Sequence, residues 1–133
     1  MIISWYNLNM KTNYSSQRNL VEQVLKSCCD HPTAEMIYLR CKQENPNIGL
    51  ATVYRNLEIL EKQNKIVKVS GTKGKERYDA DVSIHSHCIC PQCGCVVDVE
   101  CSEGLLNILQ DEKSKEGYDS VHITYYKKCK NCK

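Results

Sequence analysis

The chain has 133 residues, of which 41% are hydrophobic and 26% charged, a composition typical of globular proteins. This length leaves room for one small domain or two very small ones and excludes two large independent cores. No apolar run approaches membrane-spanning length and no signal peptide is apparent, so we expect a cytoplasmic protein. The net charge is +2, but residues 1–78 carry +5 and residues 79–133 carry −3. An excess of positive charge in the N-terminal part of a chain is typical of nucleic-acid binding.

Two short helices are predicted in the first third of the chain. Ser15 is suited to cap the first helix, and the turn Asp30-His31-Pro32 ends it. Its expected buried face consists of Leu20, Val21, Val24, Leu25 and Cys28. Thr33 is suited to cap the second helix, which is expected to stop at Asn45-Pro46. Its expected buried residues are Ala34, Ile37, Tyr38 and Cys41. Considered alone, His31 is more often a surface turn histidine than a ligand.

A third helix is predicted over residues 49–63, with one apolar and one mixed face. The apolar stripe contains Leu50, Val53, Leu57 and Leu60. The opposite side carries Ala51, Thr52 and Arg55, with Tyr54 and Asn56 at its flanks. Most such faces are simply solvated, but small, aromatic, amide and guanidinium groups together also suit the major groove of DNA.

The segment after the third helix favours DNA binding over a solvated face. An apolar strand at residues 66–69, a Gly- and Lys-rich turn and the segment 76–79 together predict a hairpin. Three helices followed by a basic hairpin are typical of a winged helix-turn-helix domain, which we place at residues 1–80. Lys73 and Lys75 would contact phosphates or the minor groove.

The rest of the chain, residues 81–133, is predicted to be a small α+β domain. Strands are expected at residues 84–90 and 95–99, followed by a helix that Ser102 caps and that ends near Gly117. The expected apolar residues of this helix are Leu105, Leu106 and Leu109. A last strand is predicted from the alternation of Val121, Ile123 and Tyr125. Fewer than sixty residues form little core, so we expect a structural metal or dimerisation.

The segment from His85 to Gly94 contains ligands for two separate metal sites. His85 and His87 are two residues apart, so in a strand they lie on the same face and can bind one ion. Cys90 has the opposite parity and forms a CxxC pair with Cys93. The matching pair is Cys129 and Cys132. Two CxxC pairs strongly indicate a tetrahedral zinc site, although 35 residues separate them. The roles of the other cysteines stay open: Cys28, Cys29, Cys41, Cys88, Cys95 and Cys101.

Five motifs, in this order, resemble the ferric uptake regulator (Fur) family of bacterial metal-dependent repressors. They are His31-Pro32-Thr33-Ala34-Glu35, the segment from Leu50 to Leu57, Arg77-Tyr78-Asp79, His85-x-His87 running into Cys90-x-x-Cys93-Gly94, and Cys129-x-x-Cys132. The resemblance spans roughly residues 15–132. It implies a winged-helix DNA-binding domain, a dimerisation domain, structural Zn²⁺ at the four cysteines, and binding of palindromic operators as a homodimer.

Within this family, the chain is most similar to the peroxide-sensing branch. The resemblance implies a regulatory site made of His31, Asp79, His85, His87 and Asp98. Iron-sensing relatives usually carry glutamate at the last position, so Asp98 favours the peroxide branch. Three imidazoles and two carboxylates suit Fe²⁺, Mn²⁺ or Zn²⁺, and Fe²⁺ or Mn²⁺ is the regulatory metal that we expect. Because the ligands come from both halves of the chain, metal binding would favour the DNA-binding arrangement.

Two alternative functions remain. The protein could sense the availability of iron, manganese or zinc instead of peroxide. Alternatively, Cys90 and Cys93 could form the redox pair of a thiol-disulfide oxidoreductase. Such an enzyme needs a helix that starts at the first cysteine, whereas Gly94 and a strand follow here, so we expect a protein that is not an enzyme.

Overall fold

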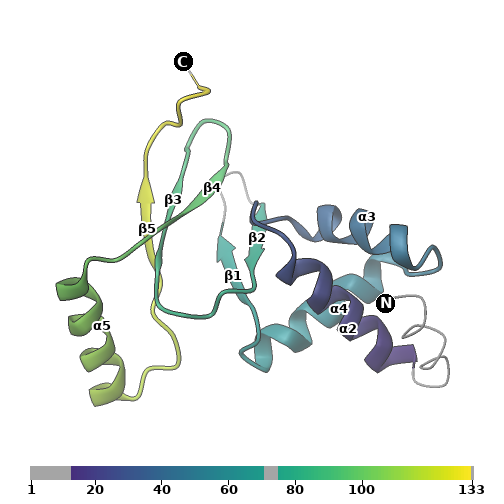
Figure 1. Ribbon diagram of the computed structural model, residues 1–133, viewed down its shortest axis with the longest axis horizontal. Helices are drawn as coiled ribbons and strands as arrows, with labels where there is room; N and C mark the ends of the chain where they lie inside the picture. The colour runs from purple at the N-terminus through teal and green to yellow at the C-terminus, as the bar shows by residue number, and fades with distance from the viewer. Residues whose placement is uncertain (1–12, 71–74, 133) are drawn as a thin grey trace. The chain divides into compact units, whose positions relative to one another are not determined.

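The computed structural model describes residues 13–70 and 75–132 of the chain, which form two compact units in a mixed α+β fold (Figure 1). Unit 1 contains the described residues up to Val82, and unit 2 contains those from Ser83 onward. Within these ranges, no helix is long and apolar enough to cross a membrane.

Unit 1 begins with the three predicted helices. They are α2 (Asn13–Lys26), α3 (Ala34–Glu44) and α4 (Leu50–Lys62). The prediction that Ser15 caps the first helix is wrong, because the helix already begins at Asn13. The predicted cap of the second helix is confirmed: Thr33 Oγ1 accepts a hydrogen bond from the backbone N–H of Met36 at 3.3 Å.

The three helices enclose one hydrophobic core. Its fully or almost fully buried members are Leu20, Val21, Leu25, Ala34, Ile37, Cys41, Ile48, Val53, Leu57, Leu60, Ile66 and Tyr78. The predicted stripe of the third helix is therefore confirmed except at Leu50, which is 38% exposed. Leu50 is the first residue of α4, where no preceding turn covers it. Cys28 lies beyond the end of α2 and is only partly buried.

A two-stranded hairpin completes unit 1. Strands β1 (Val67–Ser70) and β2 (Glu76–Asp79) pair antiparallel. The hairpin is held against the turn before α3, because the N–H of Tyr78 donates to the carbonyl of Pro32 at 3.0 Å. Unit 1 therefore has the predicted winged helix-turn-helix architecture. Lys73, predicted at the tip of the hairpin, lies outside the described residues.

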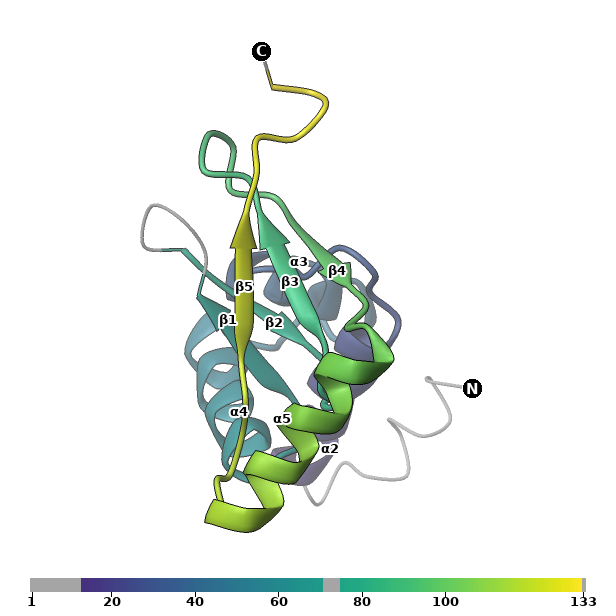
Figure 2. The ribbon, with the colours of Figure 1, turned by 90° about the vertical axis from the view of Figure 1, so that its left-hand side faces the viewer.

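Unit 2 is a three-stranded sheet with one helix. Strands β3 (Ser86–Ile89) and β4 (Val96–Val99) form an antiparallel hairpin, and β5 (Ile123–Tyr126) pairs parallel to β3. Figure 2 shows β5, β3 and β4 side by side in the order β4-β3-β5. The connection from β4 to β5 contains α5 (Glu103–Glu116), which allows the chain to return parallel to β3.

Both predicted ends of α5 are confirmed, but its predicted apolar face is not buried within the chain. Ser102 Oγ accepts from the N–H of Leu105 at 3.3 Å, and Gly117 closes the helix with a φ of +73°. No residue of α5 is buried, and Ile108 is 62% exposed. Within the described chain, the buried hydrophobic residues of unit 2 are Ile89, Cys90 and Val96. Unit 2 therefore has too small a core to be stable by burial alone.

Candidate metal centres and DNA-binding face

The first CxxC pair lies in a tight knuckle between β3 and β4. The N–H of Cys90 donates to the carbonyl of Cys95 at 3.0 Å, and the N–H of Gly94 donates to the carbonyl of Cys90 at 2.8 Å. Gly94 has a φ of +79°, a conformation that a residue with a Cβ adopts at a cost. The sequence Cys-Pro-Gln-Cys-Gly thus folds the chain back and brings Cys90, which is buried, and Cys93, which is exposed, into one loop.

The second CxxC pair follows β5 and reaches the same place. Cys90 Sγ lies 3.8 Å from Cys132 Sγ, and Cys93 Sγ lies 3.7 Å from Cys129 Sγ. Cys129 and Cys132 are 3.4 Å apart at their sulfurs. Four thiolates around one zinc ion at about 2.3 Å stand about 3.8 Å apart, so these distances suit a closed tetrahedral site.

Two of these cysteines have a lowered pKa, which favours the thiolate form. Backbone N–H groups of Cys93, Cys129 and Gln92 point at the Cys90 sulfur and lower the pKa of Cys90 to about 5. The N–H of Cys129 approaches this sulfur at 3.3 Å. The side-chain contact with Cys132 lowers the pKa of Cys129. Because zinc binds thiolates and not thiols, this donor set fits a zinc ion.

Cys95, whose role the sequence left open, belongs to the same cluster. Its sulfur and those of Cys90, Cys93 and Cys129 all lie within 4.8 Å of one another. The pattern C-P-Q-C-G-C places a third cysteine two residues after the knuckle, and this spacing could have indicated its position. Five thiols therefore meet at this end of the sheet.

The histidine motif of unit 2 forms a second, separate donor set. His85 directly precedes β3, and its ring centroid lies 4.5 Å from that of His87, which confirms that the two side chains share a face. The cross-strand partner of His87 is Asp98 on β4. Asp98 Oδ1 lies 3.1 Å from His85 Nε2 and 3.2 Å from His87 Nε2. His85 Nδ1 is 2.8 Å from the carbonyl of Ser83, and a hydrogen bond donated there by a neutral ring would make Nε2 the nitrogen that can bind a metal.

These distances are suited to a metal with mixed nitrogen and oxygen ligands. Neighbouring ligands in an octahedral shell with bonds of about 2.1 Å stand about 3 Å apart. Without a metal, the same separations correspond to carboxylate–imidazole hydrogen bonds. Two nitrogens and one oxygen meeting at one point make a half-site that a divalent ion of intermediate hardness can complete.

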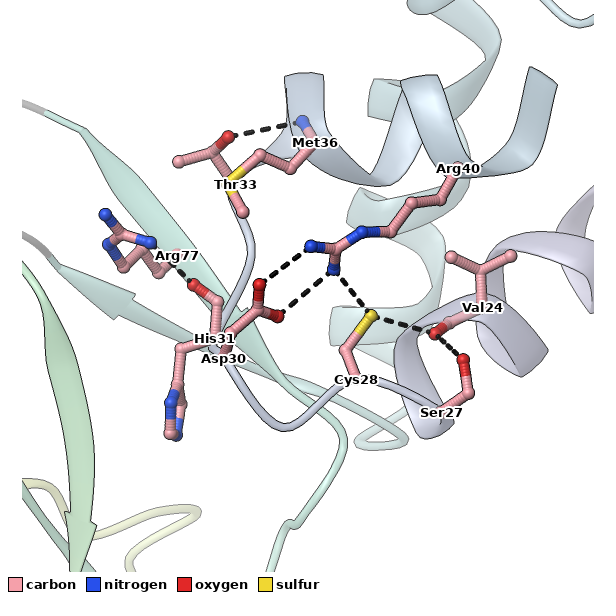
Figure 3. Close-up of polar contacts among 9 residues, drawn as sticks. All are labelled: Val24, Ser27, Cys28, Asp30, His31, Thr33, Met36, Arg40 and Arg77. Carbon is pink, nitrogen blue, oxygen red and sulfur yellow. Dashed lines mark hydrogen bonds and ion pairs between the residues drawn. The ribbon is translucent and has the colours of Figure 1, made fainter. Parts of the chain in front are cut away.

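Unit 1 contains another imidazole–carboxylate pair. His31 Nε2 lies 3.2 Å from Asp79 Oδ2, which joins the turn before α3 to the last residue of β2. His31 has a φ of +50°, and its carbonyl accepts a hydrogen bond from Arg77 Nη1 at 3.0 Å (Figure 3). Sequence reasoning identified Arg77 only as part of a motif; the structure shows that it fixes the backbone of the proposed ligand.

A second guanidinium fixes the other side of this turn. Arg40 on α3 donates to both carboxylate oxygens of Asp30, at 2.7 and 3.1 Å, and also to Cys28 Sγ at 2.9 Å (Figure 3). The paired hydrogen bonds from the Arg40 guanidinium lower the pKa of Asp30. The two arginines, one on each side, hold His31 in its left-handed conformation, which a histidine adopts more readily than most residues.

The predicted DNA-facing side of α4 is largely exposed. Ala51, Tyr54 and Arg55 are exposed, and Thr52 is partly so. The Tyr54 hydroxyl donates to Glu35 Oε1 on α3 at 2.6 Å, which lowers the pKa of Glu35 and raises that of Tyr54 to about 12. This contact joins the two helices of the helix-turn-helix and fixes the ring of Tyr54.

Asn56, a predicted DNA-contacting residue, does not lie on the exposed side of α4. Asn56 is only 4% exposed, and its amide donates to the carbonyl of Thr52 at 3.0 Å. The prediction that Asn56 flanks the exposed face is wrong, because its position on the helix turns it toward the core beside Val53 and Leu57. The other predicted wing residue within the described chain, Lys75, is exposed.

Comparison with known proteins agrees with these motifs. The model of the ferric uptake regulator family matches residues 9–126. The chain is 33% identical over 119 residues to the ferric uptake regulation protein of Bacillus subtilis (84% of this chain, 78% of the relative). It is 31% identical over 118 residues to the peroxide-responsive repressor PerR of Staphylococcus aureus (87% and 79%).

A solved structure shows the same similarity. The peroxide stress regulator of Campylobacter jejuni is 29% identical, with a TM-score of 0.76 over 99% of this chain and 98% of that one. The matched segment contains the winged helix-turn-helix, both histidine sets and the first CxxC pair. The chain belongs to the ferric uptake regulator family of metal-dependent transcription regulators.

Proposed function

We propose that this protein is a metal-dependent DNA-binding repressor that senses peroxide. The observation that carries this proposal is the carboxylate of Asp98 between the imidazoles of His85 and His87. An aspartate at this position is what the resemblance to the peroxide-sensing branch implies, and its short side chain reaches both nitrogens. The similarity to proteins named as peroxide regulators supports the same conclusion.

The regulatory ligands would be His31, Asp79, His85, His87 and Asp98. Each unit presents a preformed part of this set: an imidazole–carboxylate pair in unit 1 and two imidazoles with a carboxylate in unit 2. Binding of one ion by both parts would couple metal occupancy to the DNA-binding arrangement of the winged helices. Five ligands would leave one octahedral position open.

Sensing would depend on which metal is bound. If the donor set held Fe²⁺, the metal would promote oxidation by peroxide: one oxygen of peroxide would be added to a ligand imidazole and the other would leave as water. An oxidised imidazole is a poorer ligand, so the two parts of the set would separate and DNA would be released. Mn²⁺ does not readily drive this chemistry and should protect the protein. His31 and His85 are the candidate sites of oxidation.

The expected result is a peptide mass increase of one oxygen on His31 or His85 after peroxide treatment of the Fe²⁺-loaded protein. The Mn²⁺-loaded protein should stay unmodified and keep its DNA. His122 is exposed and lies outside both donor sets, which makes its peptide the internal control. Unmodified histidines, with DNA release caused by cysteine oxidation, would contradict the proposal.

The main alternative is a sensor of metal availability, primarily of iron. It is favoured by the 33% identity to a protein named as a ferric uptake regulator, which is similar to the identity with the peroxide repressors. The two functions differ in one result. A metal-availability sensor would release DNA when Fe²⁺ is chelated but would keep it when Fe²⁺-loaded protein meets peroxide.

A homodimer bound to a palindromic operator is the proposed active form. No residue of α5 is buried within the chain, and Val97 and Tyr125 are 55% and 47% exposed. Both residues pair with Cys88 on the central strand, so the three form one row across the sheet. A second copy covering this apolar surface would supply the core that unit 2 lacks.

Arg55→Ala is expected to weaken operator binding by about 1–3 kcal/mol if the guanidinium contacts a base edge. The Arg55 side chain is exposed on α4, next to Tyr54, whose orientation Glu35 fixes. Lys75→Ala provides the contrast, because a phosphate contact should weaken all DNA sequences alike and flatten the salt dependence. Titration of operator and scrambled DNA at several salt concentrations measures both. Unchanged specificity in Arg55→Ala would show that α4 does not contact the bases.

A further inference from the structure

The end of the sheet in unit 2 holds more sulfur ligands than one zinc ion needs. Four thiolates complete a tetrahedral zinc site, and the two CxxC pairs provide four. Cys95 brings a fifth sulfur within 4.8 Å of those of Cys90, Cys93 and Cys129. Its backbone is held there, because the carbonyl of Cys95 accepts the N–H of Cys90 at 3.0 Å.

The fifth sulfur lies close to the zinc-ligand candidates from both CxxC pairs. The sulfurs of Cys93 and Cys129 are 3.7 Å apart, and each lies within 4.8 Å of the Cys95 sulfur. Cys132, in contrast, is placed by its contacts with Cys90 and Cys129 at 3.8 and 3.4 Å. The set of donors that all lie within 4.8 Å of one another contains Cys95 and not Cys132, so Cys90, Cys93, Cys95 and Cys129 form an alternative set of four thiols.

We propose that Cys95 is a reserve zinc ligand that takes the place of Cys132 when Cys132 leaves the site. This inference rests on the proposed zinc site and extends it. The Cys95 thiol gives its proton to the departing Cys132 thiolate as one sulfur–zinc bond replaces another. Four sulfur–zinc bonds remain, the charge is unchanged, and no oxidant is needed.

Such an exchange would give the site a property that a four-cysteine site lacks. Cys132 could leave the zinc ion while the ion, and with it the knuckle between β3 and β4, stays in place. The Cys132 thiol would then be accessible to reagents without loss of the metal. A site with four ligands would lose one bond under the same conditions.

The test counts the sulfur atoms around zinc in single and double variants by X-ray absorption. Wild type and Cys95→Ser should each show four sulfur neighbours at about 2.3 Å. Cys132→Ser should also show four, because Cys95 replaces the missing thiolate. Cys95→Ser/Cys132→Ser should show three, with faster zinc loss to a chelator. The matched control is Cys101→Ser/Cys132→Ser, which also removes two thiols of unit 2 but should keep four sulfurs.

Cys101 is a suitable control because its sulfur lies 3.3 Å from Ser86 Oγ, in a contact separate from the cluster. Three sulfurs in Cys132→Ser would overturn the proposal and leave the four-cysteine zinc site intact. Four sulfurs in Cys95→Ser/Cys132→Ser, or three in Cys95→Ser, would overturn the zinc ligand assignment itself. If the double variant does not fold, the count in Cys132→Ser alone decides the question.

Discussion

Replacing Cys90 and Cys129 together with serine is expected to unfold unit 2 and to abolish dimerisation. The variant keeps Cys93, Cys95 and Cys132, one thiolate fewer than a closed zinc site requires. Structural zinc contributes on the order of 10–16 kcal/mol of apparent binding free energy in small domains. Within the described part of unit 2, only Ile89 and Val96 remain as buried hydrophobic residues to offset that loss, because the third, Cys90, is itself replaced.

Zinc content, circular dichroism and light scattering measure this result. Unit 1 should retain its helices, because its core lies in α2, α3 and α4 and contains none of these cysteines. The matched control is Cys88→Ser/Cys101→Ser, which removes two partly exposed thiols of unit 2 outside the cluster and should bind one zinc ion per chain. A folded, zinc-free dimer of the first variant would show that the cysteines have another role.

His31→Ala and Asp79→Ala are each expected to remove metal-activated DNA binding while leaving zinc and the dimer in place. Each variant deletes one donor of the pair in unit 1, whose nitrogen and oxygen lie 3.2 Å apart. Coupling between metal binding and DNA binding typically amounts to about 1–3 kcal/mol, or about 5- to 150-fold in affinity. This metal-dependent increase in operator affinity should disappear in both variants. The unit 2 donors would still bind the metal weakly, without transmitting its binding to the winged helix.

Operator binding titrated with and without Mn²⁺ measures the gain, and Mn²⁺ avoids oxidation during the assay. His122→Ala and Asp119→Ala serve as controls, since both residues are exposed and lie outside the donor sets. If His31→Ala or Asp79→Ala bound the operator as tightly as wild type, with or without metal, these residues would not form a regulatory site.

Much of the local structure could be predicted from residue types at fixed spacings. Thr33, Ser102 and Gly117 end or begin helices through bonds that involve only the nearest three or four residues. The shared face of His85 and His87 follows from the period of a strand, which depends on backbone geometry alone. Predictions at α4 were less accurate: burial there depends on which neighbours cover each position, so Leu50 is exposed and Asn56 is buried.

The sequence by itself determined the helices, the hairpins, the two CxxC pairs and the donor types of the metal-binding motifs, because each of these depends on short-range spacing and side-chain chemistry. Only the tertiary structure brought Cys129 and Cys132 to the knuckle that carries Cys90, Cys93 and Cys95, since that position depends on the parallel pairing of β5 with β3 across α5. The same holds for the arginines at His31, whose partners are 10 and 46 residues distant in sequence. Contacts between distant segments are fixed by packing and register, which no local pattern specifies.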